Sequence, residues 1–325
     1  MNTVVSRDGT RIAFDRSGIG PPVVLVGGAF QYRAFAPRTT ELARLLSADF
    51  TVFHYDRRGR GDRAPYAVQR EVEDIRAFVA EAGGSASLFG MSSGAVLALE
   101  AANQGTAVTG LALYEPPFIV DDSRAPFPPD HLARLNDLLA LGRRGDAVRF
   151  WLRQVGVPAV VMAVMRCLPA WRKFKGVAHT LPYDATIMAG TLGGARLPAG
   201  RWTTATQPAL VIVGGKSPAW MHHGTQALTG VLPSAQLQIL DGQTHMVKPG
   251  VLLPCWRNSS PASLAGRQVM KDGKRPPSHL KRKAEPMPNH NEDNKTIVRR
   301  LYGAFSASRH SAPARNSMFV QRGRR

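Results

Sequence analysis

Cysteine is scarce in this 325-residue chain, which contains only Cys167 and Cys255. Two cysteines cannot build a disulfide framework, and neither stands at the spacing of a metal-ligand or redox motif. We therefore expect two free thiols in a reducing compartment.

Long hydrophobic runs are also missing. No apolar stretch approaches the roughly 18 residues that a membrane-spanning helix needs. Residues 1–20 carry five charged side chains in place of the apolar core of a signal peptide. The sequence thus predicts a soluble, cytoplasmic protein without a membrane partner.

Acidic side chains are outnumbered, with 23 Asp and Glu against 42 Lys and Arg and a formal net charge of +19. The imbalance is uneven, because residues 251–325 hold sixteen basic and four acidic side chains. The basic excess therefore belongs mainly to this tail and does not mark residues 1–250 as a specific nucleic-acid binder.

A serine bracketed by glycines is the most informative motif that is present. Gly90, Ser92 and Gly94 fit G-x-S-x-G, between the apolar residues 88–89 and an Ala- and Leu-rich run at 95–99. This order is typical of a nucleophile elbow, a sharp strand-to-helix turn that holds the serine in a strained backbone. A chance match in a chain with 31 glycines is the alternative for the motif taken alone.

Apolar strands alternate with amphipathic helices through most of the first 250 residues. This alternation predicts a mostly parallel, doubly wound α/β sheet. The residues 3–14 are expected to form an initial hairpin. Further strands are expected at 23–26, 50–55, 87–90, 110–114, 208–213 and 235–240, and covering helices at 39–46 and 66–82.

Several predicted strands end in chemically useful loops. Glycines at 27–28 follow a buried strand, so this loop can aim a backbone N–H at a developing oxyanion. Glu115 and His245 stand just beyond two further strands, where α/β active sites gather their side chains. The charged loop 56–62 lacks the P-loop spacing, and we interpret it as a structural ion-paired turn.

Residues 120–201 break the pattern with proline-interrupted helical segments, which indicates a cap or lid. Apolar side chains of this segment are expected either to wall a substrate pocket or to form the core of the cap. They are Met162, Met165, Leu168, Trp171 and Phe174. His179 is expected to be structural.

Four motifs in this order resemble the small soluble members of the α/β-hydrolase superfamily. They are residues 23–28, 55–61, 90–94 and 242–245, and the resemblance covers about residues 3–250. It implies an α/β-hydrolase core at 1–119 and 202–250, interrupted by a helical cap at 120–201.

The resemblance also implies the chemistry. Ser92 would be the nucleophile and His245 its general base, with the backbone N–H groups of Ala29 and Ser93 as the oxyanion hole. The implied function is a serine hydrolase that cleaves a small apolar ester, thioester or lactone through an acyl-enzyme. No metal or organic cofactor is implied, and the expected partner is a small-molecule substrate.

The acid of the triad needs a separate argument. The family most often places it after the penultimate strand, but no Asp or Glu occurs between residues 185 and 240. Some members take the acid from the strand that follows the nucleophile, where Glu115 stands. We therefore predict Glu115, with Asp121 and Asp122 as weaker substitutes. The alternative is that Glu115 pairs with an arginine, which leaves a dyad or an inactive site.

The C-terminal part departs most from the family. Pro249, Gly250, Pro254 and Pro261 are incompatible with the expected final long helix over residues 248–267. Residues 251–325 are basic, proline-rich and expected to be disordered. The abrupt change near Gly250 suggests a frameshift or read-through, which resequencing the locus would test. A rival function is a catalytically weak hydrolase-like body whose tail binds nucleic acid or anionic surfaces nonspecifically.

Overall fold

The computed structural model describes residues 2–60 and 66–253, which lie within one compact unit, Met1–Gly273. A second unit, Lys274–Arg325, lies wholly outside the described residues. Cys255, the predicted disorder of the tail, its suggested origin and its nucleic-acid or anion binding therefore concern residues outside the description.

One sheet of eight strands organises the described residues, in the order β1-β2-β4-β3-β5-β6-β7-β8. The pairs β1–β2 and β2–β4 are antiparallel, and every later pair is parallel. The strands are β1 (Asn2–Val5), β2 (Arg11–Ser17), β3 (Pro22–Val26), β4 (Thr51–Tyr55), β5 (Ala86–Met91), β6 (Val108–Tyr114), β7 (Ala209–Gly214) and β8 (Ala235–Leu240). The predicted mostly parallel sheet is confirmed.

Both faces of the sheet are covered by helices, as the continuous apolar strands require. Val23 and Leu25 of β3 face a cluster with α1 (Pro37–Leu46), whereas Val24 and Val26 face a second cluster with α2 (Val68–Glu81) and α3 (Ser93–Asn103). Side chains alternate between faces with the period of two that a strand imposes. Helix α9 (Ala219–Val231), between β7 and β8, was not expected from the sequence.

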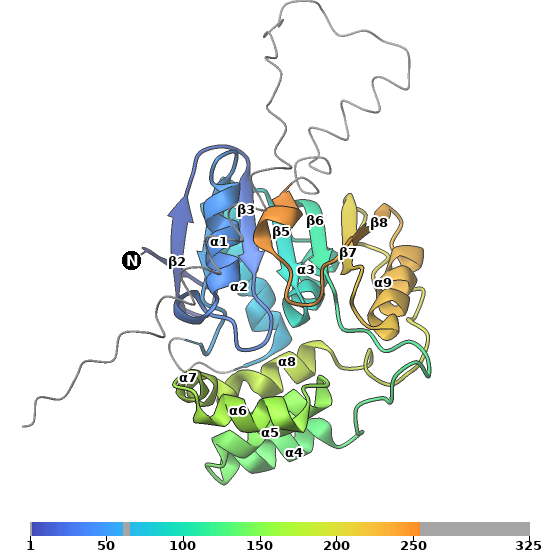
Figure 1. Cartoon of the computed structure of the whole chain (residues 1–325). Helices are drawn as coiled ribbons and strands as arrows, with labels where there is room; N and C mark the ends of the chain where they lie inside the picture. Colours follow the sequence, from blue (N-terminus) through green and yellow to red (C-terminus); the bar gives the residue numbers. More distant parts are fainter. Residues whose placement is uncertain (1, 61–65, 254–325) are drawn as a thin grey trace, which may run out of the picture. The chain divides into compact units, whose positions relative to one another are not determined.

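The segment between β6 and β7 is helical, as predicted, and its helices are grouped together in Figure 1. They are α4 (His131–Ala140), α5 (Arg144–Gln154), α6 (Ala159–Cys167), α7 (Ala170–Gly176) and α8 (Leu181–Ile187), and short 3₁₀ turns occur at Arg33–Phe35 and Ala178–Thr180. The division into core and cap at residues 119 and 201 stays a prediction.

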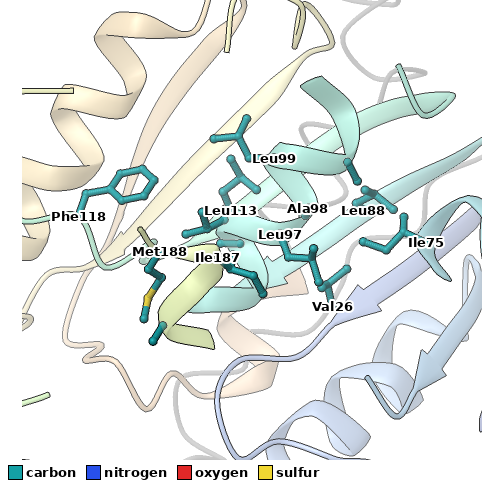
Figure 2. Packing of buried hydrophobic residues seen from close by; sticks show 14 of the residues in the cluster. Val26, Ile75, Leu88, Leu97, Ala98, Leu99, Leu113, Phe118, Ile187 and Met188 are labelled. Atoms are coloured by element: carbon teal, nitrogen blue, oxygen red, sulfur yellow. The ribbon is translucent and has the colours of Figure 1, made fainter. Parts of the chain in front are cut away.

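Helix α8 joins this helical segment to the core. Figure 2 shows Ile187 and Met188, at its end, in the same apolar cluster as Leu97 of α3 and Val26 of β3. Ile187 and Leu97 are almost completely buried. The last part of the helical segment is therefore packed firmly against the helix that follows Ser92.

Residues 249–253, the last ones that the structure describes, have a helical backbone. The rest of the range 248–267, over which no long helix is expected, lies outside the described residues. Among the described residues, no helix is long and apolar enough to cross a membrane.

Candidate active site

Three residues other than glycine have a positive φ in the described chain: Phe30 (63°), Ser92 (56°) and Glu115 (47°). Phe30 lies in the loop after β3, while Ser92 and Glu115 directly follow β5 and β6. These strands are neighbours and parallel, so their C-terminal ends meet at one edge of the sheet. Strained backbone of this kind costs about 1–3 kcal/mol per residue and gathers at functional sites.

Ser92 occupies the tight turn that the sequence predicts. A Cβ on Gly90 would lie 2.5 Å from Cα of Ala95, and one on Gly94 would lie 2.3 Å from the carbonyl oxygen of Val26. Only glycine fits at either position, because backbone atoms occupy the space of a side chain. The motif therefore has its expected context, with β5 before Ser92 and α3 after it.

Glu115 and His245 lie together, although 130 residues separate them. Oε2 of Glu115 is 2.7 Å from Nδ1 of His245, and the glutamate is completely buried. The backbone N–H of Ser92 donates to the carbonyl oxygen of Tyr114, the residue before Glu115. Ser92, Glu115 and His245 thus lie at one edge of the sheet, and Glu115 has no arginine partner among the described residues.

The loop after β7, where the family usually carries its acid, binds Glu115 instead. The N–H of Gly214 donates to Oε1 of Glu115 at 2.8 Å, and the hydroxyl of Ser217 donates to the same oxygen. Both carboxylate oxygens therefore have partners inside the protein. A lone serine gives no sequence signal of this role, so Ser217 was missed.

Tyr114 braces the histidine loop. Its hydroxyl donates to the carbonyl oxygen of Thr244, next to His245, at 2.6 Å. Burial and the neighbouring Glu115 raise the pKa of the Tyr114 phenol well above its ordinary value, so it stays protonated as a donor.

Asp121, the first of the weaker substitutes for the acid, lies beside a different histidine. Its Oδ2 is 2.5 Å from Nδ1 of His223, and its Oδ1 accepts hydrogen bonds from Ser123. Asp122 has no hydrogen bond to His245 among the described residues. The structure therefore brings Glu115, and neither aspartate, to His245.

The backbone N–H groups of Ala29 and Ser93, which the sequence analysis names as oxyanion donors, have no acceptor within the described residues. The N–H of Gly28 is already bonded to Oε1 of Gln31 at 2.9 Å. A Cβ on Gly28 would lie 3.1 Å from Cβ of Ser92, so this loop runs directly against the serine. The two predicted oxyanion donors are thus available close to Ser92.

The charged loop after β4 is an ion-paired turn over its described part, as predicted. Arg57 pairs with Glu71 at 2.6 Å and with Asp184 at 2.7 Å, while Arg60 pairs with Asp184 at 3.0 Å. Ser93 also donates to Asp184, at 2.7 Å. Asp184 was missed in the sequence, because its partners lie far from it along the chain.

Electrostatic interactions favour the charged forms of Asp184 and Arg57. Burial raises the pKa of the Asp184 carboxyl, but Arg57 and Arg60 outweigh it and hold the pKa below its ordinary value. Burial lowers the pKa of Arg57, and Glu71 and Asp184 more than compensate, so its pKa is raised. The network therefore holds ionised partners away from water.

Aromatic side chains of α7 meet the loop that carries Ala29. The ring of Phe174 packs edge-on against Phe30 at 5.0 Å and against Phe35 at 4.9 Å. Met162 and Trp171 are buried in the core cluster, whereas Leu168 is half exposed and Met165 lies between these extremes.

His179 and Cys167 are the remaining residues singled out in the sequence. Nε2 of His179 lies 2.7 Å from the carbonyl oxygen of Gly59, which fits the structural role expected for it. Cys167 carries a free thiol at the surface. Within residues 2–60 and 66–253, no group of three or more His, Cys, Asp or Glu side chains is placed to hold a metal ion.

Comparisons with known proteins agree with this fold. The model described as "Alpha/beta hydrolase family" matches residues 23–252. The crystal structure of an alpha/beta hydrolase from Sphaerobacter thermophilus is 51% identical, has a TM-score of 0.71, and covers 78% of this chain and 98% of its own. A comparison with curated proteins found no significant match.

More distant structures show the fold alone. An esterase from a Rhodococcus species is 22% identical, with a TM-score of 0.52 over 79% of this chain and 97% of its own. An N-acyl homoserine lactone degrading enzyme is 18% identical, with a TM-score of 0.52 over 83% of this chain and 99% of its own. The predicted resemblance and fold class are confirmed, and the chain belongs to the alpha/beta hydrolase family.

Proposed function

We propose that this member of the family is a serine hydrolase with Ser92 as nucleophile, His245 as general base and Glu115 as the acid. The observation that carries this proposal is the contact between Glu115 and His245 at the end of the sheet where Ser92 stands, half-buried, in its strained turn. A buried carboxylate on Nδ1 favours the imidazole tautomer with its proton on Nδ1. Nε2 is then free to accept the proton of a serine hydroxyl.

The reaction would proceed through two tetrahedral intermediates. Nε2 of His245 takes the proton of Ser92 as Oγ attacks the substrate carbonyl, and the N–H groups of Ala29 and Ser93 stabilise the oxyanion. His245 then protonates the leaving alcohol or thiol, and the acyl group stays on Ser92. Water, deprotonated by His245, attacks the acyl-enzyme, and His245 returns this proton to Oγ of Ser92 as the carboxylic acid leaves.

The substrate class follows from the surroundings of the donors. Phe30, Phe35 and Phe174 form an aromatic cluster beside Ala29, which suits an apolar acyl or alkyl group better than a charged one. We therefore propose a small, mostly apolar ester, thioester or lactone.

Steady-state hydrolysis of a chain-length series of p-nitrophenyl esters tests this function. The wild-type protein is expected to be active with short apolar acyl groups, and Ser92→Ala to have lost that activity while remaining folded. Activity that persists in Ser92→Ala would contradict the proposal. Binding of nucleic acid or anionic surfaces by the tail stays a prediction from the sequence. The cytoplasmic location also stays a prediction.

A further inference from the structure

One buried carboxylate, that of Asp184, connects the two proposed oxyanion donors. On one side it accepts a hydrogen bond from Oγ of Ser93, whose backbone supplies one donor. On the other side it accepts hydrogen bonds from Arg57 and Arg60, which hold the loop that carries Ala29. Asp184 lies in α8, outside the strands and loops that carry the proposed triad.

Arg60 holds the peptide that contains the N–H of Ala29. Its Nη1 donates to the carbonyl oxygen of Gly28 at 2.6 Å and to that of Gln31 at 2.7 Å. The carbonyl of Gly28 and the N–H of Ala29 belong to one planar trans peptide and point in opposite directions. While Arg60 binds that carbonyl, the N–H of Ala29 must therefore point away from Arg60.

Arg57 fixes the preceding peptide in the same way. Its Nη1 donates to the carbonyl oxygen of Gly27 at 3.1 Å and to Oδ1 of Asp184 at 2.7 Å, while Glu71 accepts from its other nitrogens. The two guanidinium groups and two carboxylates balance in charge, and all four side chains are buried. Bidentate pairs of this kind are geometrically specific, and water does not compete for them.

The N–H of Ser93 is held from the elbow side. The carbonyl oxygen of Ser92, in the same peptide, accepts hydrogen bonds from Ala95 and Val96 in the first turn of α3. The hydroxyl of Ser93 is fixed on Asp184. The two donors thus belong to different segments, a loop and the start of α3, and both segments are linked to one acceptor, Asp184.

We propose that Asp184 is a positioning residue that sets the orientation of both oxyanion donors, with Arg60 as its link to Ala29. This inference rests on the proposed function. It also makes α8 part of the framework that positions the oxyanion hole.

A substrate pair that differs in the oxyanion atom isolates this role. A thionoester develops its negative charge on sulfur, which accepts hydrogen bonds poorly and lies farther from the carbon than oxygen does. An aligned oxyanion hole therefore favours a p-nitrophenyl ester over its thiono analogue, since each donor is worth about 10²–10³ in rate for the oxygen substrate. The ratio of the two kcat/KM values reports alignment and is insensitive to the fraction of folded enzyme.

The neighbouring ion pair between Arg58 and Asp74 supplies matched controls. It is equally buried, with Nη2 of Arg58 2.5 Å from Oδ1 of Asp74, but neither residue bonds to the loop of Ala29 or to Ser93. We compare Asp184→Asn with Asp74→Asn, and Arg60→Lys with Arg58→Lys. A lysine keeps the charge but cannot make the four contacts of Arg60, so this pair tests the proposal even if Asp184→Asn fails to fold.

The expected result is a fall of about tenfold or more in the ester-to-thionoester ratio for Asp184→Asn and Arg60→Lys, because oxyanion stabilisation is lost. Both controls should keep the wild-type ratio even if they unfold more readily. An unchanged ratio in Arg60→Lys, with an active wild-type enzyme, would overturn the role of the network. A folded wild-type protein that hydrolyses neither substrate would instead refute the proposed function, and this inference with it.

Discussion

Oε2 of Glu115 lies 2.7 Å from Nδ1 of His245, although the two residues follow different strands and stand 130 positions apart. The glutamate is completely buried, and its other oxygen is bonded to the loop after β7. In the proposed mechanism this contact holds the histidine ring in one orientation and favours the tautomer with Nε2 unprotonated, which is the condition for base catalysis at Nε2.

Glu115→Gln is expected to lower kcat by about 10³- to 10⁴-fold, because an amide on Nδ1 permits the wrong tautomer and cannot stabilise the imidazolium. Glu115→Asp, which keeps the charge but shortens the side chain, should retain more activity. Ester hydrolysis by the three proteins at one pH measures both effects. Equal activity of wild type and Glu115→Gln would exclude Glu115 as the acid.

Ser217→Ala is expected to weaken both stability and activity. The carboxylate of Glu115 loses a hydrogen-bond donor in a buried position, which costs about 1–3 kcal/mol of unfolding free energy. Urea unfolding and ester kinetics test this, with Ser217→Thr as the variant that keeps the hydroxyl. The role assigned to Ser217 is wrong if both variants behave like wild type.

Gly28→Ala is expected to impair catalysis more than folding. The added Cβ would lie 2.8 Å from the carbonyl oxygen of Met91 and 3.1 Å from Cβ of Ser92, so the loop and the nucleophile must move apart. A displacement of about 1 Å can cost about 10²-fold in rate. Gly230→Ala, on a helix where a Cβ meets nothing, is the control and should keep wild-type kcat.

Acid should remove the stabilisation that Asp184 provides. Its pKa in the folded state lies below the ordinary value of 3.8, so its contribution is present above that value and is lost as the pH falls through the folded pKa. Asp184→Asn is expected to cost about 3–5 kcal/mol at neutral pH, since two buried arginines lose a charged partner. Denaturant unfolding should show that the difference in unfolding free energy between wild type and Asp184→Asn becomes smaller in acid.

The pKa of Asp74 is shifted in the opposite direction to that of Asp184. Burial raises its pKa, and this outweighs the lowering effect of Arg58. Protonation in acid therefore removes the cost of keeping a buried charge in the folded protein. As the pH falls, the unfolding free energy of wild type should rise relative to that of Asp74→Asn. Parallel pH trends for Asp184→Asn and Asp74→Asn would contradict the assignment of the two shifts.

Much of the fold follows from local pattern. The residues 23–26 are a continuous apolar, mostly β-branched run, and such a run forms a strand buried on both faces. Ser92 was predicted because two glycines and the change from strand to helix are all local features. Glu115 could be predicted because topology places the ends of neighbouring parallel strands together.

Asp184 and Ser217, which the sequence analysis did not identify, have no local sequence pattern that marks their role. Asp184 is one carboxylate on a short helix, and its partners Arg57 and Ser93 stand 127 and 91 positions away. Ser217 is a single serine in a loop. Helix α9 was missed because its two glycines and two threonines disfavour a helix, and packing against β7 and β8 compensates for this.

Labelling with a fluorophosphonate probe, followed by mass-spectrometric mapping of the modified peptide, tests the central claim most directly. The probe reacts only with an activated serine. We predict modification of wild-type protein at Ser92, a steep fall in its rate for Glu115→Gln and none for Ser92→Ala. A folded wild-type protein that is not labelled, or is labelled at another serine, would contradict the assignment of Ser92 as the nucleophile.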